Sequence, residues 1–459
     1  MRVPGNPHKR GALAPIGLSL TLVGQDFVSK GDERHWGSDL AARNGRGIQH
    51  YPLALAATLG LFATWGLAHR IYEAITPQFA DFFRLDSTQA ALSRSVFTDA
   101  LFLLAIPAAL FLRRFGYKLG VVFGLSSFSV GALLLYPAIA QHQYLYFLAG
   151  VIVLGAGWAW LETGANPLIV SLGSADTAVR RLNLAQSFYP VGVVAGYEAG
   201  KWLARADLSV PASQLTQAVV RPYMIVGLCV LLVAFLIENL EFPPVATQRA
   251  DHKERVSQEF RTLLARPVFR MDMAALAAYI FAHTALWTMM AGFIRAAMPA
   301  ESVMPAIDLV LFMFLVFGAG RITGTALMYR FDPNRLLAVC AGASVLLTLA
   351  AVATGGRFGV FCLLSTNFFM SIMYPTIFGA SVRGLGRLAK TASGLLVTAM
   401  GIGASAAPFA MSLAASLSSI RLAMVLPGAC FAIVLVYVRM FRRGAAAVEF
   451  DEHQAPAAS

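Results

Sequence analysis

The most constraining feature of this sequence is a series of long apolar runs separated by short polar connections. A membrane-spanning helix needs about 20 mainly apolar residues, and the chain contains about twelve such runs. We therefore predict an all-α integral membrane protein. The expected spans are 52–76, 91–112, 119–139, 144–170, 182–203, 222–241, 271–294, 305–328, 335–354, 357–381, 391–415 and 420–440.

The composition favours a lipid bilayer over water as the environment. Hydrophobic residues make up 58% of the chain and charged residues only 13%, whereas soluble domains carry about 25% charged residues. The net charge of +12 could indicate a nucleic-acid partner. The basic residues lie mostly between apolar runs, so we expect membrane topology and no nucleic acid.

Motifs of enzymes and metal proteins do not stand out. The sequence lacks a clear Ser–His–Asp arrangement, a metal cluster and a phosphate-binding Gly loop outside the apolar runs. Its four cysteines form no CxxC pair, so neither a metal site nor a disulfide framework is indicated. We expect no enzyme, no cofactor and no metal.

Basic residues alternate between the two sides of the predicted bundle. They follow the second, fourth, eighth, tenth and last spans, which all end on one side. By the positive-inside rule, that side is cytoplasmic. We expect a multi-pass protein of the inner membrane with both termini in the cytoplasm. The residues concerned are Arg113, Arg114, Lys118, Arg180, Arg181, Arg330, Arg335, Arg383, Arg387, Lys390, Arg439, Arg442 and Arg443.

A charged central segment divides the spans six and six. The expected organisation is a poorly ordered cytoplasmic extension, a first six-helix half, a cytoplasmic linker, a second six-helix half and a cytoplasmic tail. These regions are 1–50, 51–242, 243–268, 269–443 and 444–459.

The two halves also resemble each other in sequence. Residues 107–118 and 323–335 both end a helix in a cationic turn, and residues 166–173 and 374–381 both place a Pro before small residues. Any two membrane helices can share such features, but two pairs in matching order favour a duplication. Parallel six-helix halves are the architecture of the major facilitator superfamily. We predict that fold, with twelve transmembrane helices in two six-helix halves.

Glu162 is the leading functional candidate. It lies in the apolar stretch from Gly157 to Pro167 with no cation within a helical turn. A charge at membrane depth is costly and by default indicates function. Proton-coupled transport requires a carboxyl that is protonated when loaded and ionised when empty. The alternative is a structural carboxylate bonded to a neighbouring helix.

Further ionisable residues lie in the first two spans. Arg70 and Glu73 are three apart and share a helix face, so they could form a plain salt bridge. Glu73 could instead be functional. Arg94 and Asp99 could pair or could lie at the membrane interface.

The second half contributes two more. Arg321 lies among several glycines, and we expect it to orient helix ends. A single histidine in an apolar span, such as His283, more often has a structural, hydrogen-bonded role than a ligand-binding one.

Aromatic residues occur in the middle of spans. Trp65, Trp158, Trp160, Tyr189 and Trp287 lie within apolar runs, whereas tryptophan is usually enriched at the membrane interface. These residues could form a wall on which a sugar ring stacks. Simple core packing is the alternative.

With these residues in place, the chain resembles the fucose permease family, whose members are fucose–galactose–glucose:proton symporters. The likeness extends from about Trp65 to Arg439. Its most specific stretches are Leu161–Pro167, Arg181–Phe188, Gly320–Thr325 and Phe369–Phe378.

This resemblance implies two functional carboxylates. One is the Glu of a Leu-Glu-Thr motif, here Glu162. The other is an Asp shortly before Pro-Gln-Phe, and the matching residue here is Glu73, before Pro77. The resemblance implies that one of these carboxylates titrates during transport and that the other is linked to sugar binding.

Several amides of the family are replaced in this chain. An amide offers both donors and an acceptor to sugar hydroxyls, so their loss makes fucose itself a doubtful substrate. Arg70 could neutralise Glu73 or could bind the carboxylate of a uronic acid. The residues at the changed positions are His69, Arg70, Tyr72, Tyr189, His283 and Met373.

The combined prediction is a monomeric, proton-coupled monosaccharide symporter that works by alternating access. Glu162 and Glu73 are expected to couple protons. Rival hypotheses are a sodium-coupled sugar transporter, an importer of a uronate, a sugar sensor that does not transport and an exporter of hydrophobic drugs. The expected substrate-binding residues are His69, Arg70, Tyr72, Asn166, Gln186, Tyr189, His283 and Trp287.

Overall fold

The structure, a computed structural model, describes residues 52–204, 221–249, 256–298 and 306–442. Every regular element in these ranges is a helix, which confirms the all-α prediction. The expected N-terminal extension and C-terminal tail lie outside the described residues.

Within the described residues each half contains six spans, and four of the twelve consist of more than one helical element. The first half contains α3 (Pro52–Phe82), α4 (Ser87–Phe115), α5 (Tyr117–Ala140), α6 (Tyr144–Ser171), α7 (Ala178–Gln186) with α8 (Phe188–Ala204), and α10 (Arg221–Asn239). The second contains α13 (Pro267–Ala297), α14 (Ala306–Leu327), α15 (Pro333–Thr354), α16 (Gly356–Met370) with α17 (Met373–Val382), η4 (Gly386–Leu388) with α18 (Ala389–Leu417), and α19 (Ile420–Ala423) with α20 (Val425–Tyr437) and η5 (Val438–Arg442).

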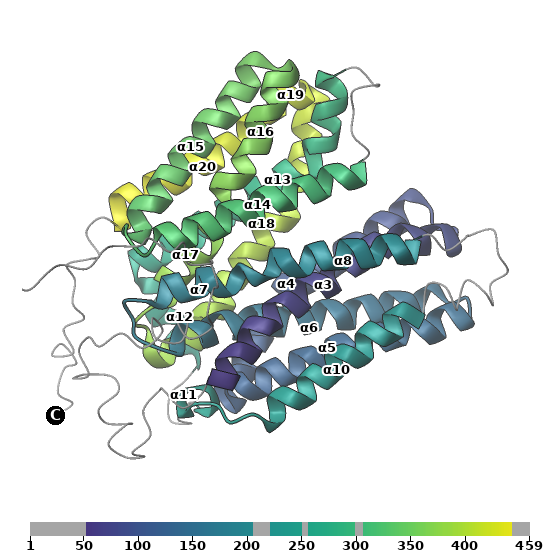
Figure 1. The fold of residues 1–459 in the computed structure, drawn as a ribbon, viewed down its shortest axis with the longest axis vertical. Coiled ribbons are helices and arrows are strands. Elements are labelled where there is room, and N and C mark those ends of the chain that lie inside the picture. The colour runs from purple at the N-terminus through teal and green to yellow at the C-terminus, as the bar shows by residue number, and fades with distance from the viewer. Residues whose placement is uncertain (1–51, 205–220, 250–255, 299–305, 443–459) are drawn as a thin grey trace, which may run out of the picture.

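Two short helices, α11 (Pro244–Thr247) and α12 (Val256–Ala265), connect the halves. The halves approach each other at the end that carries α7, α12 and α17, and they diverge toward the opposite end (Figure 1). We call the end at which the halves approach each other the linker end.

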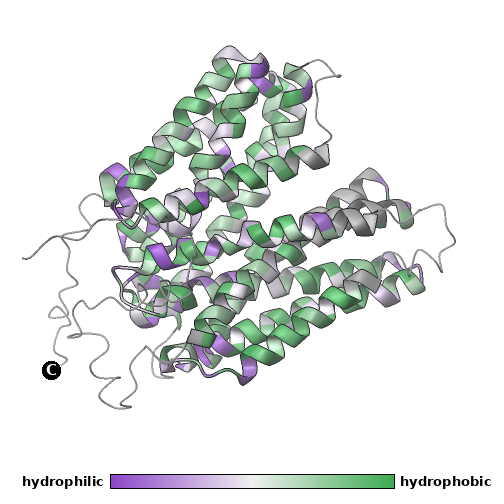
Figure 2. Cartoon of the chain, in the orientation of Figure 1, coloured by the Kyte–Doolittle hydropathy of each residue, from purple (hydrophilic) through white to green (hydrophobic). Residues whose placement is uncertain are grey.

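Seven helices in the described ranges are long and apolar enough to cross a membrane. Three shorter apolar helices lie within α3, α10 and α14. Hydrophobic residues extend along the length of the long helices, and hydrophilic residues are concentrated toward the helix ends (Figure 2). The first span, expected at 52–76, continues to Phe82.

Polar side chains fix several helix ends. Asp86 and Gln89 form a capping box at the start of α4, where the Gln89 backbone N–H donates to Asp86 Oδ1 at 2.8 Å. Arg181 donates to the carbonyl oxygens of Ile169 and Val170 at 3.2 and 2.6 Å. The last carbonyls of a helix lack intrahelical partners, so the buried Arg181 side chain supplies hydrogen-bond donors to the C-terminal end of α6.

Three predicted spans are interrupted rather than continuous. The expected helix 182–203 breaks at Ser187 between α7 and α8, and the expected helix 357–381 breaks after Met370 between α16 and α17. The expected helix 420–440 breaks at Met424 between α19 and α20. A break in the backbone leaves hydropathy unchanged, so the apolar pattern could not reveal it. Interrupted helices free backbone groups that other residues must satisfy.

Glycines allow α3 and α8 to pack backbone to backbone. A Cβ added at Gly192 would lie 1.8 Å from the Ala63 carbonyl oxygen, and one added at Gly66 would lie 2.2 Å from that of Tyr189. Small residues at such interfaces let membrane helices approach closely. This contact positions Tyr189 beside α3.

Candidate functional site

Glu162 lies at the centre of a buried hydrogen-bond network. Its side chain on α6 is 4% exposed. The Glu162 Oε1 atom accepts a hydrogen bond from Asn166 Nδ2 at 2.7 Å and another from the Tyr374 hydroxyl. Asn166 Nδ2 also lies 3.0 Å from the Tyr374 hydroxyl oxygen. Because Tyr374 belongs to α17, the carboxylate is bound by both halves.

The network continues from Asn166 to a second cross-half contact. Gln186 Nε2 donates to Asn166 Oδ1 at 2.8 Å, and Arg321 Nη1 donates to Gln186 Oε1 at 3.2 Å. Gln186 ends α7 in the first half, and Arg321 lies on α14 in the second. A continuous hydrogen-bonded path therefore joins Glu162 to Arg321.

Arg321 also binds the backbone at two of the helix breaks. Its Nη1 donates to the Gln186 carbonyl at 3.1 Å, and its Nε and Nη2 donate to the Ser371 carbonyl at 2.8 and 2.6 Å. Its guanidinium carbon lies 4.6 Å from the centre of the Phe317 ring. This agrees with the expectation that Arg321 orients helix ends, since three of its four hydrogen bonds are to backbone carbonyls at the breaks.

A separate bond joins two of the interrupted helices. Asn183 Nδ2 on α7 donates to Thr376 Oγ1 on α17 at 3.1 Å, and both side chains are fully buried. The halves are thus held together by polar contacts near the breaks.

Aromatic side chains of α13 and α14 surround His283. Its ring stacks on Tyr279 and Phe317, with centroids 5.9 and 5.6 Å apart, and meets Trp287 edge-on at 4.7 Å. The buried His283 Nε2 and Tyr279 hydroxyl have no hydrogen-bond partner within the part of the chain that the structure describes. Whether His283 is structural or binds substrate therefore stays a prediction.

Trp287 is anchored by an amide. Its Nε1 donates to Asn367 Oδ1 at 2.8 Å. The indole is therefore held in one orientation against the Phe314 ring, whose centroid is 4.3 Å away.

A second aromatic group lies in the first half. Trp65 meets Trp158 and Tyr189 edge-on, at centroid distances of 6.1 and 6.0 Å. Arg70 is 8% exposed, and its guanidinium carbon lies 5.7 Å from the centre of the Tyr197 ring. Tyr189 therefore belongs to this wall, and Arg70 packs on the neighbouring helix α8.

Three predicted site residues are not placed beyond their backbone. His69, Tyr72 and Glu73 lie on α3, and their side chains fall outside those that the structure describes. The proposed pairing of Arg70 with Glu73 therefore stays a prediction. The same holds for Arg94 with Asp99, although Asp99 Oδ1 accepts a hydrogen bond from Ser405 Oγ at 2.8 Å.

Tyr374 and Asn367 are site residues that the sequence analysis did not select. Tyr374 stands before Pro375 in an apolar run, and a buried hydroxyl there needs a partner. That requirement could have marked it as a candidate. Nothing in the sequence identifies Glu162, 212 residues away, as the partner.

The comparisons with known proteins agree on one family. Residues 52–408 match the model of the Major Facilitator Superfamily. The chain is 31% identical to the L-fucose-proton symporter of Escherichia coli, over 85% of this chain and 93% of that one. It is 29% identical to a glucose/galactose transporter of Brucella abortus, over 85% and 94%.

Solved structures show the same likeness. The crystal structure of a Major Facilitator Superfamily transporter, FucP, in the outward conformation superposes with a TM-score of 0.77. That structure is 32% identical and the match covers 84% of this chain and 97% of the other.

Proposed function

The chain belongs to the fucose permease family of the Major Facilitator Superfamily, and from that premise we propose that it is a proton-coupled monosaccharide symporter. This membership confirms the predicted fold of twelve transmembrane helices in two six-helix halves, and it confirms a transporter rather than an enzyme. Its relatives are an L-fucose-proton symporter and a glucose/galactose transporter.

One observation carries the proposal for coupling. The carboxylate of Glu162 accepts hydrogen bonds from Asn166 of its own half and from Tyr374 of the other. Protonation of Glu162 would remove a charge-assisted acceptor, and such hydrogen bonds are about twice as strong as neutral ones. The proton thereby weakens a contact between the halves, which alternating access requires.

The proposed substrate site lies between the two aromatic groups. Trp287 and His283 would form one wall, and Tyr189 the other. The buried Nε2 of His283, which has no hydrogen-bond partner among the described residues, would bind a sugar hydroxyl. The remaining proposed residues are Asn166 and Gln186 near the coupling network, and His69, Arg70, Tyr72 and Glu73 on α3.

We assign the protein to the inner membrane as a monomer, with both termini and the linker in the cytoplasm. The positive-inside pattern supports this orientation. The halves meet at the linker end (Figure 1), so the binding site would open to the outside.

Uptake into proteoliposomes tests the proposal. Purified protein would be given labelled neutral hexoses, 6-deoxyhexoses and uronates under an imposed pH gradient, and in parallel under a sodium gradient. We expect the pH gradient alone to drive uptake of a neutral monosaccharide. Uptake driven only by sodium would contradict proton coupling, and uptake of uronates alone would make Arg70 the substrate-binding cation.

A further inference from the structure

Asp99 is a carboxylate at membrane depth that lies outside the network around Glu162. It is near the middle of α4 and is partly exposed. Ser405 Oγ on α18 donates to Asp99 Oδ1 at 2.8 Å, and this is the one polar interaction of the carboxylate in the part of the chain that the structure describes. An ionised carboxylate offers about four acceptor sites, and a charge at membrane depth is costly. Asp99 therefore has acceptor capacity left for a ligand.

Between the linker end and Asp99, helices α4 and α18 are in close contact. A Cβ added at Gly394 would lie 2.5 Å from Ala109 Cβ, and one added at Gly401 would lie 2.0 Å from Phe102 Cβ. The two helices run in opposite directions, so the next facing position on α4, away from the linker end, is Asp99. No room for a ligand exists on the linker side of this position, because the two backbones are too close.

Beyond Asp99 and Ser405, the facing sides of the two helices become exposed. Pro408 and Ser412 follow Ser405 by three and seven residues, so they lie on its side of α18, and both are exposed. Leu92, seven residues before Asp99 on α4, is 45% exposed. The halves diverge in this direction (Figure 1), so Asp99 lies where their separation begins.

The aromatic group of the first half lies at the same depth as Asp99. Phe97, two residues before Asp99, packs its ring against Trp158 with the centroids 4.9 Å apart. Trp158 in turn meets Trp65, whose ring contacts Tyr189. One wall of the proposed substrate site is therefore level with this carboxylate.

The aromatic group of the second half reaches this depth too. A Cβ added at Gly403 on α18 would lie 3.2 Å from the Phe281 backbone nitrogen on α13. Both helices start at the linker end and run in the same direction, so two residues further along, Ser405 lies beside the turn that carries His283. Asp99 is therefore located between the two aromatic groups that would enclose the sugar.

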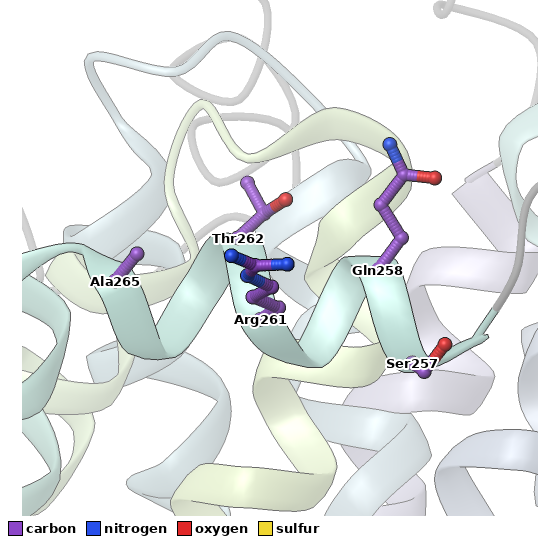
Figure 3. A pocket seen from close by; sticks show the side chains of 5 residues that line it. All are labelled: Ser257, Gln258, Arg261, Thr262 and Ala265. Carbon is purple, nitrogen blue, oxygen red and sulfur yellow. The ribbon is translucent and has the colours of Figure 1, made fainter.

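The surface pocket on the linker helix α12 is a poor alternative site for a sugar. The residues that line it are Ser257, Gln258, Arg261, Thr262 and Ala265 (Figure 3). All of them belong to one helix and none is aromatic, whereas a ligand site encloses most of its ligand and is lined largely by apolar and aromatic side chains. Sugar recognition is thus to be sought between the halves.

We propose that Asp99 binds a hydroxyl group of the transported sugar and that Ser405 holds the carboxylate in position. The inference rests on the proposed function, since it adds a residue to that substrate site. An ionised carboxylate can only accept hydrogen bonds, so it suits the hydroxyl donors of a neutral monosaccharide. It repels the like charge of a uronate. Asp99 thereby selects neutral sugars over acidic ones.

Equilibrium binding in detergent tests the proposal without any proton gradient. The purified protein would be titrated with labelled neutral hexoses and 6-deoxyhexoses, among them L-fucose, D-galactose and D-glucose. Asp99→Asn keeps the shape of the side chain and removes its charge, and we expect the Kd of the sugar that binds most tightly to rise about tenfold or more. Asp176→Asn is the matched control, because Asp176 is exposed in the connection between α6 and α7. It should leave the Kd unchanged.

Analogues that lack one hydroxyl distinguish a direct contact from a structural role. We expect the unsubstituted protein to bind one monodeoxy analogue of its sugar about tenfold more weakly than the sugar itself. Asp99→Asn should bind this analogue and the sugar with similar Kd values, because the contact is already lost. A variant that was only distorted would still discriminate against the analogue as the unsubstituted protein does, and that result would overturn the proposal.

Acidic sugars provide a second readout of opposite sign. Glucuronate and galacturonate should bind the unsubstituted protein more weakly than the neutral sugar, and Asp99→Asn should reduce this difference. If the unsubstituted protein binds a neutral sugar and Asp99→Asn matches Asp176→Asn for every compound, Asp99 is not a binding residue and the proposed function stands. If the unsubstituted protein binds no neutral monosaccharide of the panel, the proposed function fails together with this inference.

Discussion

At the scale of single residues, Tyr374 connects the coupling carboxylate to the second half. It donates to the same Glu162 oxygen as Asn166. We predict that Tyr374→Phe lowers the initial rate of proton-driven uptake about tenfold or more, since a hydrogen bond to a charged group contributes about 1.5–3 kcal/mol. Initial rates in proteoliposomes measure this effect.

Tyr136→Phe is the control for that substitution. Tyr136 is 47% exposed on α5, so its hydroxyl is remote from the network and uptake should be unchanged. Equal rates for Tyr374→Phe and Tyr136→Phe would show that the Tyr374 bond is dispensable.

The sequence predicts part of this network and not the rest. Glu162 and Asn166 are four residues apart on one helix, so they share a face, and a buried carboxylate there indicates function. Tyr374 and Arg321 reach the same network from the second half. Contacts over such sequence separations depend on how the halves are placed, which periodicity and hydropathy do not determine.

At the scale of helices, the contact between α3 and α8 depends on glycine. Gly192→Ala places a methyl group against the Ala63 carbonyl, and overpacking of this kind costs about 1–3 kcal/mol. We predict a lower apparent melting temperature in detergent, measured by size-exclusion chromatography after heating.

Gly60→Ala is the matched substitution on α3. A Cβ added at Gly60 meets no atom within 4 Å, and alanine favours a helix over glycine by about 1 kcal/mol. Its melting temperature should be unchanged or higher. If Gly192→Ala melted at the same temperature as Gly60→Ala, close packing at this contact would not matter.

Hydropathy predicts the positions of the helices but not the breaks within them. The predicted span 335–354 nearly coincides with Pro333–Thr354. Pro190 and Pro375 lie four residues after Gln186 and Ser371. Because proline has no backbone N–H, it cannot bond to the carbonyl four residues earlier, and Arg321 donates to these two carbonyls instead. The linker helix α12 was also missed, since the sequence analysis treated that segment only as charged.

At the scale of the whole molecule, two contact layers hold the halves together. One is the network around Glu162, and the other is the contact of Glu259 in the linker helix α12 with Arg113 of α4 and Thr391 of α18. Both use a carboxylate that accepts hydrogen bonds or ion pairs from the two halves at once. In this account the proton releases the first layer.

The central claim is that Glu162 carries the proton that moves with the sugar. The most direct test records external pH in a weakly buffered suspension of proteoliposomes after a transported sugar is added, with exchange of labelled sugar measured in the same preparation. We predict that the unsubstituted protein makes the medium alkaline as sugar enters. Glu162→Gln should still exchange sugar but produce no pH change. If Glu162→Gln moved protons with sugar as the unsubstituted protein does, another residue would be the proton carrier and the account would be contradicted.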